Sequence, residues 1–109
     1  MNFVNLTPHA LNIIEEDGTT VYTLPASGQI ARVEVERTVD FVMDGIEVFS
    51  TVYGQVSGLP ERQTDTAYIV SALVAQAAKR SDVYSPGELV RNGDGQVIGC
   101  RGLTYHVGM

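Results

Sequence analysis

Alternation between apolar and polar residues runs through most of this sequence and predicts β-strands. It is cleanest over residues 30–37, where apolar side chains alternate with Arg and Glu, and it continues through residues 38–43. After Asp44-Gly45 it resumes over residues 46–52. Successive side chains of a strand point to opposite faces, so each run predicts a strand with one apolar face. The Asp-Gly dipeptide predicts a tight hairpin, because both central residues of a type I′ turn need positive φ.

Similar turn signals divide the rest of the chain into hairpins. Three turns between β-prone runs predict an antiparallel meander. Gly54 is expected to mark a bulge or a close approach of the backbone, and residues 81–87 are expected to be irregular. The other turn signals are Asp17-Gly18 and Asn92–Gly95, and the other predicted strands are residues 3–6, 9–14, 21–24, 88–91, 96–101 and 102–109.

One stretch, at about residues 70–80, breaks this pattern and predicts a helix. Its apolar residues recur at helical spacing and form a single stripe. Ser71 can cap the helix by accepting a hydrogen bond from a backbone N–H two or three residues on. Lys79 and Arg80 suit the negative end of the helix dipole. The expected fold is therefore α+β, mainly β: an antiparallel β-meander or a partly open barrel covered by one α-helix.

The composition indicates one folded domain over residues 1–109. Hydrophobic residues make up 44% of the chain, which argues against wholesale disorder. Cys100 is the one cysteine, so no internal disulfide can form and no oxidising compartment is implied. The sequence shows neither a secretion signal nor an apolar run that could span a bilayer. We therefore expect a cytoplasmic protein.

The net charge narrows the range of partners. Seven basic residues against 13 acidic residues give a net charge of −6, which disfavours duplex nucleic acid and anionic membrane as partners. One small anionic ligand, held by a few local arginines, is still compatible with this charge. A strand that leads into a helix directs free N–H groups at one point, which is a common anion site. Ser71 stands at that point.

Candidate ligand-binding residues gather around the predicted helix, and each has a simpler interpretation. Capping alone explains Ser71, and this remains the preferred interpretation. Arg80 is followed by Asp82, which can pair with it. Convergence of two or three arginines near the helix start would be meaningful, because the Arg fork suits phosphate oxygens. The candidates are Ser71, Arg62, Arg80, Tyr84 and Arg101.

Nothing in the sequence predicts catalysis, a metal site or a cofactor. His9 and His106 lie far apart in sequence and Cys100 stands alone, with no spacing typical of zinc ligands. Ser71 lies outside the Gly-x-Ser-x-Gly turn that exposes a nucleophile. The carboxylates of residues 15–17 are expected at a hairpin tip, whereas paired-carboxylate catalysis needs a dry cleft. We therefore expect a protein that is not an enzyme.

Several short motifs together resemble a family of small proteins that phages, prophages and bacterial genomes encode. The resemblance covers most of the chain and leaves only the C-terminal tail outside it. It implies a small accessory protein of a virus, acting in the cytoplasm of the bacterial host. The motifs are Asn5-Leu-Thr-Pro-His9, Pro25–Gly28 with Ala31–Val33, Tyr53-Gly54 with Gly58–Pro60, Tyr68–Ser71 and Gly99-Cys100.

Two functions of different kinds follow as expectations. The first is a non-enzymatic, homo-oligomeric binder that sequesters a small anionic, nucleotide-derived host signal and so acts against host defence. In this case the Ala-rich helix can pack against a symmetry mate, and a C2 dimer is the default oligomer. The alternative is a protein-interaction module, either a virion accessory or an inhibitor of a host protein, since an acidic surface and free strand edges suit that role.

Overall fold

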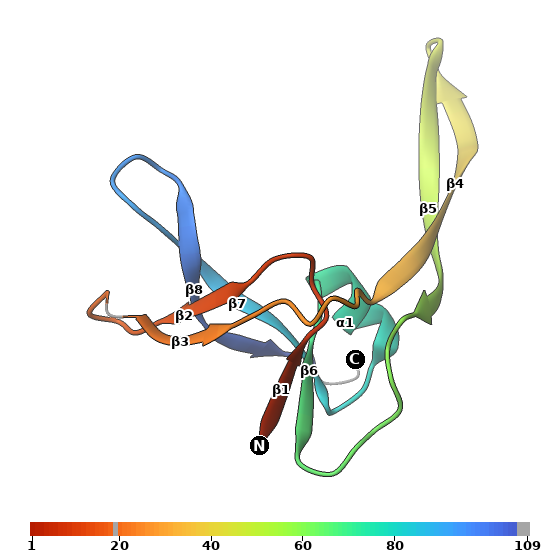
Figure 1. Ribbon diagram of the computed structural model, residues 1–109. Coiled ribbons are helices and arrows are strands. Elements are labelled where there is room, and N and C mark those ends of the chain that lie inside the picture. The colour runs from red at the N-terminus through yellow and green to blue at the C-terminus, as the bar shows by residue number, and fades with distance from the viewer. Residues whose placement is uncertain (19, 107–109) are drawn as a thin grey trace.

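The chain folds into a six-stranded sheet, one short helix and a two-stranded arm (Figure 1). The computed structural model describes residues 1–18 and 20–106. The expected α+β, mainly β class is confirmed. In chain order the elements are β1 (Asn2–Asn5), β2 (Leu11–Ile14), β3 (Thr20–Leu24), β4 (Arg32–Met43), β5 (Ile46–Ser57), β6 (Thr66–Ile69), α1 (Ala72–Ala78), β7 (Val83–Arg91) and β8 (Val97–Tyr105).

Strand pairing in the six-stranded sheet is mixed, in the order β1-β6-β7-β8-β2-β3. The β2–β3 and β7–β8 pairs are antiparallel hairpins. In contrast, β1 lies parallel to β6, β6 to β7, and β2 to β8. The predicted antiparallel meander is therefore wrong for these three strand pairs. A turn dipeptide fixes pairing only within its own hairpin, whereas these pairs depend on packing between segments that are distant in sequence.

The two edge strands of the sheet meet at one end, so the sheet curls like a partly open barrel. Asn5, at the end of β1, bridges to Ala26, just after β3. The buried side chain of Asn5 fixes this seam: its amide donates to the carbonyls of His9 (2.9 Å) and Leu24 (3.0 Å). Its Oδ1 accepts from the backbone N–H (3.0 Å) and the hydroxyl (2.6 Å) of Thr7. The Asn5-Leu-Thr-Pro-His9 motif thus has a structural role.

The β6–α1–β7 segment is a crossover between parallel neighbours. Parallel strands need a connection of about a dozen residues or more, and a helix is the usual solution. Strands of this kind are buried on both faces and have continuous apolar sequences. In β6, Ala67, Tyr68 and Ile69 are all buried.

The helix is shorter than predicted at both ends. Ser71 is its N-cap, and its hydroxyl accepts a hydrogen bond of 3.3 Å from the N–H of Val74. Val70 lies between β6 and the helix, and its N–H donates to the carbonyl of Tyr84 in β7 at 2.8 Å. Lys79 adopts a left-handed conformation and ends the helix, so the predicted basic last turn is wrong. Arg80 lies beyond the helix.

The core lies where α1, the curled sheet and the root of the arm meet. Burial of a large apolar side chain contributes about 1.5–3 kcal/mol, so this cluster is a main source of stability. Val33 of β4 and Val56 of β5 pack against it from the arm. Its buried members are Leu6, Ala31, Tyr68, Val70, Val74, Ala75 and Val83.

The segment predicted to be irregular is instead the start of β7, which contains Pro86. Successive residues of a strand direct their backbone groups to alternate sides, so Pro86 faces the same side as Tyr84, toward β6. Tyr84 is the last residue of β7 that pairs with β6. The missing N–H of Pro86 therefore leaves no gap in the sheet, as for a proline on an edge strand.

The β4–β5 hairpin projects from the rest of the molecule as an arm (Figure 1). Its strands pair only with each other among the described strands. Asp44 and Gly45 both have positive φ, 47° and 81°, which confirms the predicted turn. Register shifts mark two bulges, one of them beside Gly54 as predicted. A compact chain of this length has a radius of gyration of about 13 Å, whereas this chain reaches 16.7 Å.

Candidate functional site

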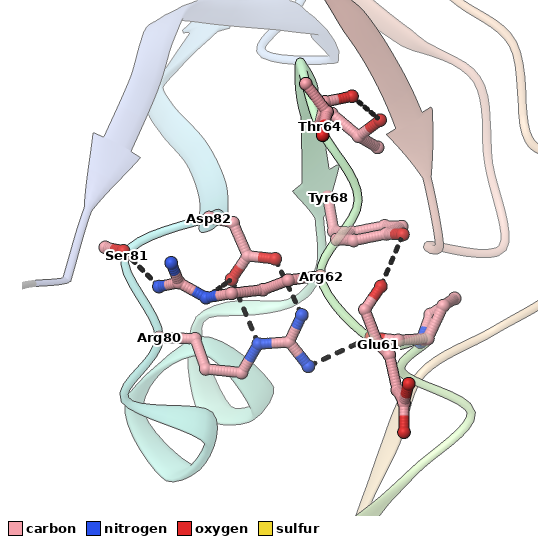
Figure 2. A network of polar contacts seen from close by, with 9 residues as sticks. Glu61, Arg62, Thr64, Tyr68, Arg80, Ser81 and Asp82 are labelled. Atoms are coloured by element: carbon pink, nitrogen blue, oxygen red, sulfur yellow. Dashed lines mark hydrogen bonds and ion pairs between the residues drawn. The ribbon is translucent and has the colours of Figure 1, made fainter.

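Two of the predicted ligand-binding residues, Arg62 and Arg80, converge on Asp82 (Figure 2). Arg80 makes a bidentate pair: its Nε donates to Oδ1 at 2.9 Å and its Nη2 to Oδ2 at 2.6 Å. Arg62 lies 3.8 Å from the same carboxylate and also donates to the hydroxyl of Ser81. The expected pairing of Arg80 with Asp82 is confirmed.

This network joins the loop before β6 to the chain that leaves α1. Nη1 of Arg80 donates to the carbonyl of Pro60 at 2.9 Å, and its guanidinium lies 5.9 Å from the ring centroid of Tyr68. The hydroxyl of Tyr68 donates to the carbonyl of Glu61 at 3.1 Å. Figure 2 shows the Arg80 guanidinium between Asp82 and the loop, with the hydroxyl of Tyr68 directed at Glu61. These contacts hold the loop against Asp82, and we refer to Arg62, Tyr68, Arg80 and Asp82 together as the clamp.

Electrostatics in the clamp favour the charged form of both main partners. The hydrogen bonds from Arg80 hold the pKa of Asp82 below its usual value, against the opposing effect of burial. The same contact raises the pKa of Arg80. The Asp82 side chain is only 11% exposed, whereas that of Arg62 is 61% exposed. The charge of Arg80 is thus compensated within the protein.

The clamp is separated from Ser71 by the length of α1. Ser71 caps one end, and the chain reaches Arg80 after the other end. Seven helical residues span about 10 Å at 1.5 Å per residue. Two arginines do converge, but on an internal carboxylate at the far end of the helix and not near the helix start, where convergence would have indicated an anion site. Sequence spacing could not show this, because Arg62 reaches the clamp from a loop.

The other two predicted residues, Tyr84 and Arg101, lie on the β7–β8 hairpin. The ring of Tyr84 packs against that of Tyr105, with centroids 5.6 Å apart. Arg101 is exposed on β8 and stands opposite Glu88. Within the described part of the chain, no hydrogen bond or ion pair joins either residue to Ser71. The ring contact accounts for Tyr84, and Arg101 occupies an exposed position on a strand.

A groove does open beside Ser71, with a volume of about 360 Å³. Its lining includes Thr7, Arg32 and Leu73 together with apolar residues of the arm root. Arg32 belongs to the polar positions of the alternation over residues 30–37, and no sequence signal links it to Ser71. The two residues line one groove because the root of β4 packs against α1.

Two other chemically notable groups are buried. The Cys100 side chain is fully buried, and burial raises the pKa of its thiol, as expected for a small core residue. Ser85, also buried, lies 2.7 Å from Nε2 of His106. The sequence did not indicate this serine–histidine pair. A serine that is 2% exposed gives a substrate no access, so the pair has the character of an internal hydrogen bond.

Many of the exposed large apolar side chains of the described residues lie on the arm. Cross-strand partners share a face, so the register of β4 and β5 assigns each side chain to one of two faces. The 4.7 Å contact of the Arg37 guanidinium with the Phe49 ring, and the 3.3 Å contact between the hydroxyls of Thr38 and Ser50, agree with this assignment. The inner face, which continues outward from the core, carries Val35, Arg37, Val39, Val42, Glu47, Phe49, Thr51 and Tyr53, and the outer face carries Glu36, Thr38, Phe41, Met43, Ile46, Val48, Ser50 and Val52.

Comparisons with known proteins add no identification. No protein-family model matches the chain, and neither curated proteins nor solved structures give a match. The resemblance to phage and prophage proteins therefore stays a prediction. Over residues 1–18 and 20–106, no helix is long and apolar enough to cross a membrane, and no three potential metal ligands cluster together.

Proposed function

We propose that this chain is a non-enzymatic protein-interaction module whose docking element is the β4–β5 arm. One observation carries the proposal: most large apolar side chains on the arm beyond its root are about half exposed or more. Val39 is 48% exposed, Phe49 46% and Ile46 68%. Monomeric proteins rarely leave a large continuous apolar surface in water, and such surfaces mark contact sites.

The length of the arm gives a second argument for a partner. Only Val33 and Val56, at the root, pack against the core. A two-stranded hairpin without a third strand or a packed face is marginally stable at best in water. Contact with another protein would supply the missing packing. The exposed rows of N–H and C=O groups on both outer edges add a surface suited to protein contact.

The distribution of charge favours this function over the capture of a small anion. Arg80, one of the two arginines that converge, is compensated by a nearly buried carboxylate, and the hydroxyl of Ser71 is occupied by capping. The resemblance to phage-encoded proteins fits a virion accessory or an inhibitor of a host protein. Such a role needs a contact surface and no catalytic group.

A photo-cross-linking amino acid at position 49 tests this proposal. The matched control places the same group at Gln96, which is exposed in the β7–β8 turn. The chain is irradiated alone and in a lysate of the cells that carry its gene. Discrete protein adducts from position 49, absent from position 96 and lost in Val39→Lys, support the proposal. Equal or no adducts from the two positions would refute it.

The groove beside Ser71 supports a second candidate function, the sequestration of a small anionic, nucleotide-like molecule. Its volume of about 360 Å³ lies at the lower end of the range for ligand pockets, and Arg32 provides a cation at its wall. Calorimetry against cyclic nucleotides and ADP-ribose derivatives tests it, with Arg32→Ala as the variant. Saturable binding that the variant weakens at least tenfold supports this function, and no heat from any ligand refutes it.

A further inference from the structure

The inner face of the arm begins on the core and runs outward without a cover. At its root, Val33 and Val56 pack beneath α1. Farther out, Val35, Tyr53 and Val39 follow in the same phase and are 47%, 50% and 48% exposed. The face is thus an extension of the hydrophobic core into solvent, which distinguishes it from the outer face.

The inner face carries two charged side chains, and they have opposite signs. On this face, Arg37 is the β4 residue next to Val39 on the side of the root. Glu47 is the β5 residue next to Phe49 on the side of the tip. The Val39–Phe49 pair lies midway between them. A twofold axis through that level, with the tips of two arms pointing in opposite directions, would place Arg37 of each copy near Glu47 of the other. With the tips pointing the same way, like charges would come together.

We propose, building on the function proposed for the arm, that the occupant of the inner face is a second copy of this chain. Two arms pack inner face to inner face, antiparallel, about a twofold axis at Val39. The contact is isologous, so one patch provides both sides of the interface, as in most homodimers. This differs from the dimer through the Ala-rich helix that the sequence suggested.

The available area suits a modest dimer. An aromatic side chain buries 150–250 Å² when fully covered, so Phe49 and Tyr53, about half exposed, each offer roughly 100 Å². With the valines and the aliphatic parts of Arg37 and Glu47, the face offers on the order of 600 Å² per copy. Two copies then reach the lower end of the 1,200–2,000 Å² typical of specific interfaces. We expect dissociation in the micromolar range.

The tip of each arm would reach the root of the other. Along the arm, the distance from the axis at Val39 to the turn at Asp44-Gly45 is about the same as the distance from the axis to residues 34–35, nearer the root. At that level, a groove of about 310 Å³ opens between β5 and α1, lined by residues that include Tyr53, Leu73 and Lys79. The acidic tip of one copy would thus approach a lysine of the other.

Sedimentation velocity of the full chain from 1 to 100 µM tests the proposal. The wild type should shift from monomer, 11.8 kDa, toward dimer across this range. Val39→Lys should weaken dimerisation at least tenfold. The matched control is Val52→Lys, a similarly exposed valine on the outer face, and it should dimerise like the wild type. Circular dichroism shows whether each variant is folded.

Charge reversal tests the antiparallel arrangement independently. Arg37→Glu and Glu47→Arg should each weaken dimerisation several-fold, and the double variant should recover to within about threefold of the wild type. A wild type that is monomeric at 100 µM overturns the proposal, as does a double variant weaker than both single variants. Equal loss in Val39→Lys and Val52→Lys overturns it too. A monomer that still cross-links another protein through position 49 overturns self-association alone, and a monomer with no cross-link overturns both proposals.

Discussion

Replacing Asp82 by Asn should destabilise the protein strongly, although Asp82 lies on no proposed interface. Asp82 accepts two charge-assisted hydrogen bonds from Arg80, at 2.9 and 2.6 Å, and its side chain is 11% exposed. A hydrogen bond to a charged group contributes about 1.5–3 kcal/mol. Asn keeps one acceptor and leaves Arg80 uncompensated, so we expect a loss of about 2–3 kcal/mol. The melting temperature should fall by about 10 °C.

Urea denaturation at pH 7 measures this loss, with Arg62→Ala as the control. Arg62 contacts the same carboxylate from a 61% exposed position, and exposed pairs contribute less than about 1 kcal/mol. If Asp82→Asn costs no more stability than Arg62→Ala, the Arg80–Asp82 pair does not stabilise the fold as described.

The pH dependence gives a second check on the same residue. The folded-state pKa of Asp82 is lowered, so its stabilising effect is present above the unfolded pKa, about 3.9. The effect is lost as the pH falls through the folded-state value. The difference between wild type and Asp82→Asn should therefore shrink below about pH 4. A difference that stays constant down to pH 2 would contradict the assignment.

Three further predictions concern local structure. Asn5→Ala should cost about 2–4 kcal/mol in urea denaturation, because it leaves the buried seam without its amide; a loss below 1 kcal/mol would contradict the role of Asn5. Ser71→Ala should cost about 1 kcal/mol through loss of the cap, and Ser71→Asp should cost less; equal losses would argue against capping. The Cys100 thiol, buried and with a raised pKa, should react with a thiol reagent only after denaturation; rapid labelling of the native protein would contradict its burial.

Local signals in the sequence predicted the local structure well. The Asp44-Gly45 turn and the Ser71 cap both depend on residues close together in the chain. The parallel pairs β1–β6 and β2–β8 do not, because the sequence pattern of one strand does not identify the strand that pairs with it. The Asn5 motif was noticed as a resemblance, but its hydrogen bonds across the seam needed the fold.

The candidate site was harder to predict for a related reason. The apolar residues that alternate from Ala31 to Val35 are typical of a strand with one buried face. The same pattern would be found whether the strand is packed along its whole length or leaves the core after Val33. Exposure of the arm therefore could not be read from the pattern. Likewise, proximity of Arg62 and Arg80 to the helix in sequence did not show that both meet at Asp82.

Hydrogen–deuterium exchange of the full chain shows whether a second copy covers the inner face of the arm. We expect the amides of β4 and β5 between Val35 and Tyr53 to exchange more slowly at 100 µM than at 1 µM. Amides of β6, within the sheet, should exchange equally at both concentrations. Val39→Lys should abolish the difference in the arm. Exchange in the arm that does not change with concentration, in a chain that remains folded, would rule out self-association through the inner face.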